Sequence, residues 1–341
     1  MNKQDIIFVT GGTGLVGSYL LRHLISQGYT NVRSLKRENS NLQLVKEIAD
    51  QIDWLVGDLL EIDVLAEGMQ DAQVVFHCAA MVSFDPKEKS SMERVNIEGT
   101  ANMVNIALDS NVEKFIHVSS IAALGRREEL STIDEKTEWQ NSEWNTTYAV
   151  AKYEAEMEVW RGAAEGLNVA VINPSVILGS AYWKKGTGRF FNIVWNGLKF
   201  FPTGSTGFVD VRDVAEALLT LAESDISNER IILNGENLPY KHIFDSIALL
   251  IEKPKPSIKV NTLIREASWR FDHVLNVLFS KKPRVTKETA RNSSRDVRYL
   301  NDKSKNLLGI KYRSIDQCLK QMANQFNEVK NNGMDPRYLE F

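Results

Sequence analysis

The chain has 341 residues and a formal net charge of −3. So small a charge gives no general attraction to nucleic acid or to acidic membranes, and neither partner is expected. The two cysteines exclude a disulfide framework and a cysteine-rich metal site, so we expect no metal and a reducing, cytoplasmic location. Neither a signal peptide nor a run of about 18 apolar residues stands out, which predicts no transmembrane segment.

Apolar runs alternate with helical periodicity through the first half of the chain, as in parallel strands joined by crossover helices. Strands are expected at 6–10, 31–36, 52–56, 73–78, 113–119, 168–173 and 230–234. Helices are expected at about 15–27, 42–50, 60–69, 90–109, 148–165 and 210–223. The sequence therefore predicts an α/β fold with a doubly wound parallel (Rossmann) sheet. Ligands of such sheets bind beyond the carboxyl ends of the strands, where functional residues are expected.

The first strand runs into a glycine-rich turn with the spacing GxxGxxG at Gly11, Gly14 and Gly17, and a helix follows the turn. Glycine permits positive φ and a close approach of the main chain to a phosphate, while the helix N-terminus adds a favourable dipole. This turn predicts a site for the pyrophosphate of a nicotinamide dinucleotide. The residues expected to contact the dinucleotide here are Gly11, Thr13, Gly14, Leu15 and Val16.

Basic residues follow the second expected strand. An NAD site commonly has an acid about twenty residues beyond the glycine turn, where it binds the ribose hydroxyls. Lys36 and Arg37 occupy this place instead. Because both could pair with a 2′-phosphate, the sequence favours NADP(H), with NAD(H) as the alternative. A solvated basic loop would leave the same pattern.

Acidic and small residues follow the third and fourth expected strands. Asp58, next to Leu59, could place a carboxylate against the adenine amino group. Ala79 and Ala80 leave room for a cofactor to pass close to the main chain. Cys78 is interpreted as a small core residue rather than a nucleophile, because its one basic neighbour in sequence should point to the opposite face of the sheet.

Residues able to carry out acid–base chemistry lie at the fifth strand end and at the start of the helix expected at 148–165. Tyr148 and Lys152 are four residues apart, so they share one helical face. A nearby ammonium favours the phenolate and is expected to lower the phenol pKa from about 10. Ser120 could donate a hydrogen bond to a substrate carbonyl oxygen and to the tyrosine oxygen. We therefore expect Ser120, Tyr148 and Lys152 to be catalytic, with Ser120 also touching substrate.

Tyr299 and Lys303 repeat the same spacing in a polar C-terminal stretch. No strand-borne serine precedes them, and no buried strand follows shortly after. The second pair is therefore interpreted as incidental.

Several motifs combine into a family resemblance. They are the TGxxGxxG turn at 10–17, Val95-Asn96 with Gly99-Thr100, the YxxxK of Tyr148 and Lys152, the segment NPSVILG at 173–179 and the segment FVDVRDVA at 208–215. With them, the chain resembles the extended short-chain dehydrogenases/reductases of the NAD-dependent epimerase/dehydratase superfamily over about residues 5 to 235.

This resemblance implies that Ser120, Tyr148 and Lys152 form a catalytic triad whose last two members also touch the cofactor. It implies that Asn96 helps to fix the cofactor side or a proton-relay water. The residues implied to border the nicotinamide are Pro174, Ser175 and Val176.

Within the family, the chain is similar to dihydroflavonol reductases and 3β-hydroxysteroid dehydrogenases. The stretch at 32–37 is similar to the VRAxVR stretch of the flavonoid-type reductases, which maps their phosphate-binding arginine onto Arg37. The resemblance implies NADP(H)-dependent reduction of a ketone or aldehyde, or the reverse oxidation of an alcohol, on a hydrophobic small molecule. A nucleotide-sugar epimerase or dehydratase with retained NAD(P) is the alternative, and a redox-sensing protein without turnover is a third.

Extended members carry a discontinuous substrate lobe. By resemblance, residues 1–173 and 208–234 form the NAD(P)-binding domain, and residues 174–207 and 235–341 form a smaller, largely C-terminal lobe. A homodimer through the helices near 90–109 and 148–165 is also implied.

Substrate contacts are expected from Ser83 and Phe84, just after the fourth strand, and from Trp183 in the aromatic run at 182–201. Most members of that run could equally build the lobe's core. The aromatic-then-basic stretch at 269–298 is interpreted as a lid, a phosphate-binding flank or a membrane-surface contact, with a solvated face as the alternative.

Overall fold

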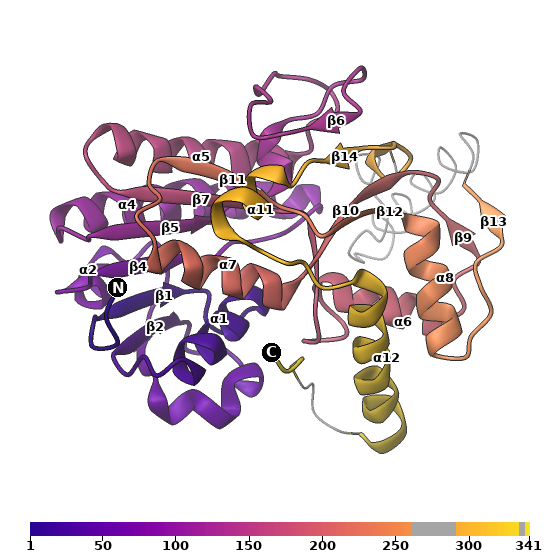
Figure 1. Cartoon of the computed structure of the whole chain (residues 1–341), viewed down its shortest axis with the longest axis horizontal. Coiled ribbons are helices and arrows are strands. Elements are labelled where there is room, and N and C mark those ends of the chain that lie inside the picture. The colour runs from indigo at the N-terminus through magenta and orange to yellow at the C-terminus, as the bar shows by residue number, and fades with distance from the viewer. Residues whose placement is uncertain (261–290, 334–337) are drawn as a thin grey trace.

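A seven-stranded parallel sheet forms the centre of the computed structural model, which describes residues 1–260, 291–333 and 338–341 (Figure 1). Its strands lie in the order β11-β7-β5-β4-β1-β2-β3. They are β1 (Ile7–Thr10), β2 (Val32–Lys36), β3 (Asp53–Val56), β4 (Val74–His77), β5 (Lys114–Val118), β7 (Val169–Pro174) and β11 (Glu229–Leu233). The chain winds outward in both directions from β1 and β4, so the predicted doubly wound sheet is confirmed.

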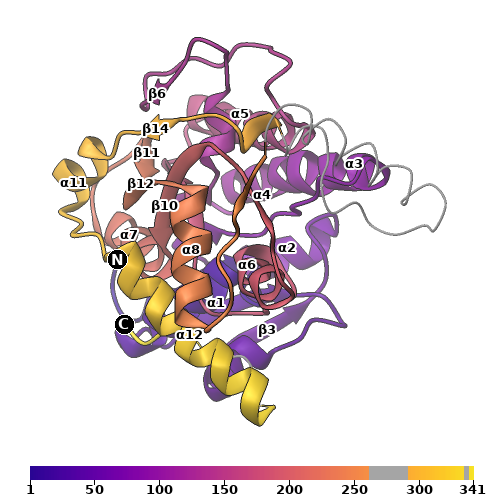
Figure 2. The same cartoon turned by 90° about the vertical axis from the view of Figure 1, so that its right-hand side faces the viewer.

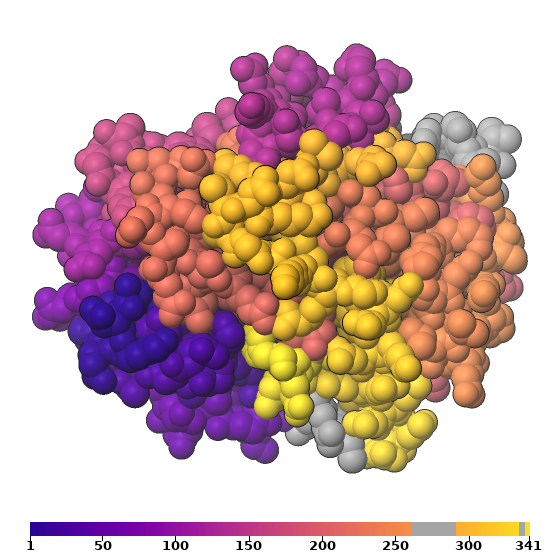
Figure 3. All heavy atoms as spheres, viewed as in Figure 1, coloured from indigo at the N-terminus to yellow at the C-terminus, as the bar shows by residue number. Residues whose placement is uncertain are grey.

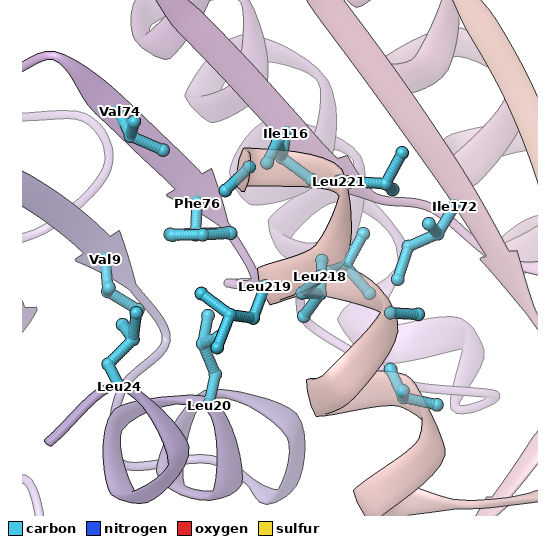
Figure 4. Close-up of a cluster of buried hydrophobic side chains, with 14 of the residues drawn as sticks. Val9, Leu20, Leu24, Val74, Phe76, Ile116, Ile172, Leu218, Leu219 and Leu221 are labelled. Carbon is cyan, nitrogen blue, oxygen red and sulfur yellow. The ribbon is translucent and has the colours of Figure 1, made fainter. Parts of the chain in front are cut away.

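Two layers of helices cover the sheet because side chains alternate between its faces. Ile7 and Val9 of β1 pack with α1 (Leu15–Ser26) and α7 (Val211–Glu223), as Figure 4 shows for Val9. Phe8, between them, packs with the other layer. That layer is α2 (Ile62–Met69), α4 (Gly99–Asp109) and α5 (Thr147–Ala164). Both faces of β1 are therefore buried, which explains its continuous apolar run.

Two of the expected helices differ in kind from the prediction. Residues Gln43–Gln51 form a 3-10 helix rather than an α-helix. The helix expected at 90–109 is interrupted: α3 (Lys89–Glu93) and α4 are joined by one π-helical turn over Arg94–Glu98. A π turn inserts one extra residue per turn, so it re-aims the side chains that it carries. Asn96 stands in this turn.

The second lobe is built on a three-stranded sheet in the order β12-β10-β8 (Figure 2). Its strands are β8 (Val176–Leu178), β10 (Ser205–Asp210) and β12 (Glu236–Pro239). The helices α6 (Arg189–Trp195), α8 (Tyr240–Leu250) and α12 (Ile315–Asn332) complete its core. Two short strand pairs flank it: β9 (Phe200–Phe201) with β13 (Ile258–Lys259), and β6 (Thr132–Ile133) with β14 (Arg298–Tyr299).

The two lobes interleave more than the expected boundaries imply. The boundary expected at 207/208 falls inside β10, which pairs with β8 and β12 rather than with the large sheet. The helix α11 (Asp302–Leu308) lies within the expected lobe segment, yet it packs against β11 of the large sheet and against α7. Residues 208–210 therefore lie in the smaller sheet, and part of the C-terminal segment returns to the larger one.

The C-terminal residues also join the lobes, and in Figure 3 they lie as yellow atoms against the indigo N-terminal domain. The amide of Leu339 donates to the Tyr19 hydroxyl on α1 at 2.7 Å. The Phe341 ring stacks on His23 at 4.5 Å between centroids. Arg212, at the start of α7, donates to the Glu340 carbonyl oxygen at 2.7 Å. These contacts tie residues 339–341 to α1 and α7, the two helices on one face of the large sheet.

Candidate functional site

The turns after β1 and β4 touch where the strand order reverses. Gly11 has φ of +74°, and a Cβ placed there would lie 2.8 Å from the Ala79 amide nitrogen. A Cβ on Gly17 would lie 2.2 Å from the Gly11 carbonyl oxygen. Glycine is therefore required at 11 by both conformation and space, and at 17 by the approach of α1 to the turn.

The N-terminus of α1 fits the pyrophosphate predicted from the sequence. Gly14 is the N-cap residue, and no side chain caps this end of the helix. Leu15 and Val16 follow it in the first turn, so their amides point out of the helix end beside Thr13. An uncapped helix N-terminus beside a glycine turn at a topological switch point suits a dinucleotide pyrophosphate.

A hydrogen-bonded chain beneath this turn links β1, β4 and α4. The Ala79 amide donates to Thr10 Oγ1 at 3.2 Å, and Thr10 Oγ1 lies 2.8 Å from His77 Nδ1. His77 Nε2 lies 3.0 Å from Thr100 Oγ1, which donates to the Asn96 carbonyl oxygen at 2.6 Å. Burial, with the charge of a nearby lysine, lowers the pKa of His77 to about 3, so the ring is neutral.

The donor and acceptor of each hydrogen bond in this series follow from the two ends of the series, the Ala79 amide and the Asn96 carbonyl oxygen. The Thr100 hydroxyl hydrogen is used on the Asn96 carbonyl, so Thr100 Oγ1 accepts from His77 Nε2–H. His77 Nδ1 then has no hydrogen and accepts from the Thr10 hydroxyl. The sequence analysis missed this role of His77, although Thr10 and His77 each end a strand and are register partners in the β1–β4 pair.

Asn96 holds the loop after β4 by its side chain. Met81 donates its amide to Asn96 Oδ1 at 2.8 Å, and Asn96 Nδ2 donates to the Met81 carbonyl oxygen at 2.9 Å. Asn96 is 2% exposed. It therefore positions the segment that follows Ala79 and Ala80, the two residues expected to line the cofactor.

The residues expected at the adenosine end stand at strand ends on one edge of the sheet. Arg37 directly follows β2 and is exposed. Asp58 follows β3 and is half-buried, and its Oδ1 accepts from the Leu60 amide at 3.3 Å. Leu59 is buried against Gly99. A Cβ placed on Gly99 would lie 2.9 Å from the Leu59 Cβ. Leu59 thus packs as a wall beside Asp58.

The three expected catalytic side chains come together beside the end of β5. Ser120 hydrogen-bonds to the Tyr148 hydroxyl. Lys152, one turn further along α5, donates from Nζ to the Val118 carbonyl oxygen at 3.0 Å. Thr146 caps α5 by accepting the Ala149 amide at 3.0 Å, which fixes the helix start just before Tyr148.

The electrostatics of this group differ from the expectation that lysine acidifies tyrosine. Burial raises the pKa of Tyr148, and the hydrogen bond from Ser120 and the charge of Arg126 oppose that rise without cancelling it. Burial lowers the pKa of Lys152 to about 8. The phenol is therefore protonated at neutral pH. The difference arises because burial destabilises the phenolate by more than the Ser120 hydrogen bond and the Arg126 charge stabilise it.

The residues expected beside the nicotinamide lie where β7 passes into the second lobe. Pro174 ends β7, and Val176 begins β8. Ser175, between them, is buried, and its hydroxyl has no hydrogen-bond partner in the part of the chain that the structure describes. A Cβ on Gly207 would lie 2.9 Å from the Ser175 Cβ, so β10 closes over this junction.

Two of the three further substrate candidates lie beside the tyrosine-bearing region. The Phe84 ring packs edge-on against Tyr148 at 5.9 Å between centroids and is 39% exposed. Ser83 donates to Glu88 Oε2 at 2.7 Å and accepts the Asp85 amide at 3.1 Å, so its hydroxyl holds its own loop.

Trp183 lies elsewhere. It is 6% exposed and packs against Phe191 and Phe326 in the core of the second lobe. Trp183 therefore builds the core of this lobe, which was the alternative to a substrate contact.

The stretch at 269–298 lies largely outside the described residues, which resume at residue 291. Two arginines of its basic end are bound within the protein. Arg291 stacks over the Trp144 ring at 3.6 Å, and Arg295 lies over the same ring at 4.7 Å. Arg295 also donates to backbone carbonyls, among them that of Leu130 at 3.1 Å. In this part of the stretch, arginine anchors the loop that carries Trp144.

Three further observations concern the Cys78 thiol, the length and apolarity of the helices, and clusters of metal-binding side chains. Burial raises the pKa of the Cys78 thiol to about 12, so it is not a thiolate at neutral pH. In the described ranges, no helix is both long and apolar enough to cross a membrane. The same ranges hold no group of three His, Cys, Asp or Glu side chains placed to bind a metal.

Comparison with known proteins identifies the family. The model of the NAD-dependent epimerase/dehydratase family matches residues 7–234. The chain is 31% identical over 329 residues to a putative dihydroflavonol 4-reductase of Synechocystis sp., with 94% of each chain covered. It is 26% identical over 339 residues to cinnamoyl-CoA reductase 1 of Petunia hybrida, with 95% of this chain and 92% of the relative covered.

Solved structures share the whole fold. The crystal structure of gox2253 has a TM-score of 0.80 at 30% identity, over 95% of this chain and 98% of that chain. The UDP-glucose 4-epimerase of Thermotoga maritima has a TM-score of 0.77 at 21% identity, over 95% and 99% of the two chains, and so shares the fold alone. This chain is an NAD(P)-dependent enzyme of the extended short-chain dehydrogenase/reductase type, and it belongs to the NAD-dependent epimerase/dehydratase family.

Proposed function

We propose that this enzyme is an NADP(H)-dependent reductase of a ketone or aldehyde on a hydrophobic small molecule, with Tyr148 as the general acid. The observation that carries the proposal is the group formed by Ser120, Tyr148 and Lys152 at the end of β5, on the same sheet edge as the glycine turn. Two relatives whose printed names denote reductases support the direction of the chemistry.

The chain's own residues supply the proton and the orientation of the substrate. A bound reduced nicotinamide would supply the hydride. Ser120 Oγ, which hydrogen-bonds to Tyr148, would also hold the substrate carbonyl oxygen. Tyr148 would pass its hydroxyl proton to that oxygen as negative charge develops there. The raised pKa of Tyr148 keeps this proton in place until the carbonyl oxygen becomes basic enough to take it.

Lys152 stabilises the phenolate that proton transfer leaves behind. Its ammonium is 1% exposed and is held by the Val118 carbonyl, so its charge acts in a poorly solvated surrounding. In the same step, Phe84 offers an apolar ring edge-on to Tyr148. A substrate with an aromatic or aliphatic body beside its carbonyl group suits this neighbour.

The preference for NADP(H) rests on the end of β2. Arg37 is exposed there and directly follows the strand, in the place where an NAD site commonly has its ribose-binding acid; the acid Glu38 comes one residue later. A guanidinium can hold a phosphate through two parallel hydrogen bonds. The residues proposed to hold the rest of the cofactor are Gly11, Thr13, Gly14, Leu15, Val16, Asp58, Leu59, Ala79, Ala80, Pro174, Ser175 and Val176.

The test is a panel of aromatic and aliphatic ketones and aldehydes, with NADPH consumption followed against product formed. We expect one NADPH consumed per carbonyl reduced, and no turnover in the panel by Tyr148→Phe. A sugar-nucleotide epimerase with retained cofactor would instead convert its substrate with no net NADPH consumption, which would overturn the proposal. For the cofactor, Arg37→Ala should weaken NADPH binding about tenfold and leave NADH binding unchanged; equal loss for both would contradict the role of Arg37.

A further inference from the structure

Glu156 is a buried carboxylate that no step of the proposed reaction uses. It lies on α5 one turn beyond Lys152 and is 0% exposed. Burying a charge is costly unless the charge is paired and its lone pairs are filled. Both oxygens of Glu156 accept hydrogen bonds, and the donors come from the residue after β5, from β7, from β11 and from α5 itself.

One oxygen joins the ends of two strands that carry the site. Glu156 Oε2 accepts from Ser119 Oγ at 2.5 Å and from Asn173 Nδ2 at 2.8 Å. Asn173 Nδ2 also donates to the Ser120 carbonyl oxygen at 2.9 Å. Ser119 directly precedes the proposed substrate-binding serine, and Asn173 directly precedes Pro174. The carboxylate therefore fixes β5 and β7 relative to each other at the point where both meet the reacting groups.

The other oxygen is held by a charge from the edge of the sheet. Glu156 Oε1 accepts from Arg230 on β11, at 2.6 Å from Nε and 2.5 Å from Nη2. Trp160 Nε1 donates to the same oxygen at 3.1 Å. The side chain of Arg230 is 20% exposed, so the guanidinium pairs with the buried carboxylate from the side nearer to solvent.

The negative charge also acts on Lys152. Burial lowers the pKa of Lys152 to about 8, and the charge of Glu156 opposes that fall. Tyr148 lies one turn before this lysine on α5 and keeps its proton at neutral pH. Among the other titratable groups near the ammonium are His77 on β4, Cys78 directly after it, and His117 on β5. Burial lowers the pKa of both histidines and raises the pKa of the Cys78 thiol, so all three are uncharged at neutral pH.

We propose that Glu156 is a positioning residue which fixes the strand ends that carry Ser120 and Pro174, and whose charge balances the ammonium of Lys152. The inference rests on the proposed function for what Ser120 and Lys152 do. The contacts of Glu156 and its effect on the lysine stand without it. Ser119, Asn173 and Arg230 then serve the site as the partners that hold this carboxylate.

The test is a titration of Lys152 by NMR in protein labelled with ¹³C and ¹⁵N at lysine, with the signal assigned by its absence in Lys152→Met. In Glu156→Gln we expect the midpoint of Lys152 to fall by about one pH unit, because an opposite charge is lost. Glu154→Gln is the matched control: it is an exposed carboxylate on the same helix, and its loss should leave the midpoint in place.

Glu156→Gln leaves Arg230 without its buried partner and can fail to fold. The double variant Glu156→Gln/Arg230→Gln removes one negative and one positive charge and so leaves the net charge of the site unchanged. We still expect a lower midpoint in it, because the charge of Glu156, one turn along α5, acts on the pKa of Lys152, whereas that of Arg230 is not among the charges that shift it. An unchanged midpoint in every folded Glu156→Gln protein would overturn the inference.

Activity gives a second readout. With a carbonyl substrate found in the panel, the alkaline fall in kcat should move to lower pH in Glu156→Gln, whereas Glu156→Asp should keep its pH range and lose rate, because the charge stays and the reach to Ser119 is lost. A fall in kcat without any movement of the pH profile would mean that Glu156 is structural only. If no carbonyl is reduced by the wild-type enzyme, the proposed function fails, while the titration still decides the role of Glu156.

Discussion

The chain carries the spacing Tyr-x-x-x-Lys twice, and the two segments fold differently. Tyr148 and Lys152 both lie on α5, so a separation of four residues places them on one helical face. Tyr299 ends the short strand β14, and Lys303 lies on the following helix, α11. The spacing therefore has chemical meaning only where both residues belong to one helix.

The surroundings separate the two segments further. Tyr299 is 1% exposed, and its carbonyl oxygen accepts from the side-chain Nδ2 atoms of Asn234 and Asn237 at 2.9 and 3.0 Å. Lys303 donates to the Arg230 carbonyl at 2.6 Å and pairs with Glu229 at 2.5 Å. These contacts join the C-terminal region to β11 and to the residues that follow it, and β14 also pairs with β6. Its role is structural, as the sequence context indicated.

The largest difference in activity is expected between the variants of the two tyrosines. Tyr148→Phe is expected to lower kcat for carbonyl reduction by roughly 10²–10⁴, because it removes the proposed proton donor. NADPH affinity should stay near that of the wild-type enzyme. Tyr299→Phe, the matched change in the second segment, should leave kcat near the wild-type value. Steady-state kinetics and a fluorescence titration with NADPH measure both; equal losses in the two variants would erase the distinction between the segments.

The second-largest difference in activity is expected between the variants of the two lysines. Lys152→Met is expected to lower kcat by roughly 10², because it removes a buried positive charge beside the developing phenolate. Lys303→Met retains the fold and should leave kcat unchanged. Circular dichroism of both proteins controls for folding. A folded Lys152→Met enzyme with full activity would show that Tyr148 works without its neighbour.

The pH dependence should sharpen the same contrast. The pKa of Lys152 is lowered to about 8, so its ammonium is present below that pH and lost above it. We expect kcat to fall as the pH rises through about 8, approaching tenfold per pH unit. The profile of Lys303→Met should overlay that of the wild-type enzyme. A profile that stays flat to pH 10 would mean that the charge of Lys152 does not serve the reaction.

The smallest effect is expected on stability. Lys303→Met removes an ion pair whose carboxylate, Glu229, is 42% exposed, and such pairs contribute about 1 kcal/mol or less. Urea unfolding followed by tryptophan fluorescence would measure the change. A loss of several kcal/mol would show that α11 depends on this contact far more than an exposed ion pair allows.

The first half of the fold could be predicted from sequence because its strands are buried on both faces and its helices carry one apolar face. Each observed strand of the large sheet begins and ends within one residue of its expected range. The short strands of the second lobe escaped prediction because β8 has three residues and β9, β13 and β14 have two each. Such short strands carry no readable period.

The residues of the site likewise fall into a group that the sequence predicts and a group that only the structure reveals. Tyr148, Lys152 and Ser120 follow from local spacing and from a strand end, so the sequence reveals them. His77 and Glu156 acquire their roles only from partners on other elements: Thr10 and Thr100 for the imidazole, and Asn173 and Arg230 for the carboxylate. Strand register brings those partners together, and no spacing along one chain encodes it.

The acceptor for the Lys152 ammonium is a peptide oxygen, that of Val118. Replacing the side chain at 118 alters bulk but cannot delete this oxygen, which is present at every amino acid. The hydrogen bond that orients the cation thus comes from the main chain of the central sheet, and a point mutation can remove only the charge of Glu156 that balances it. Substrate-facing loops can therefore be re-engineered around Tyr148 without rebuilding the electrostatic support behind it.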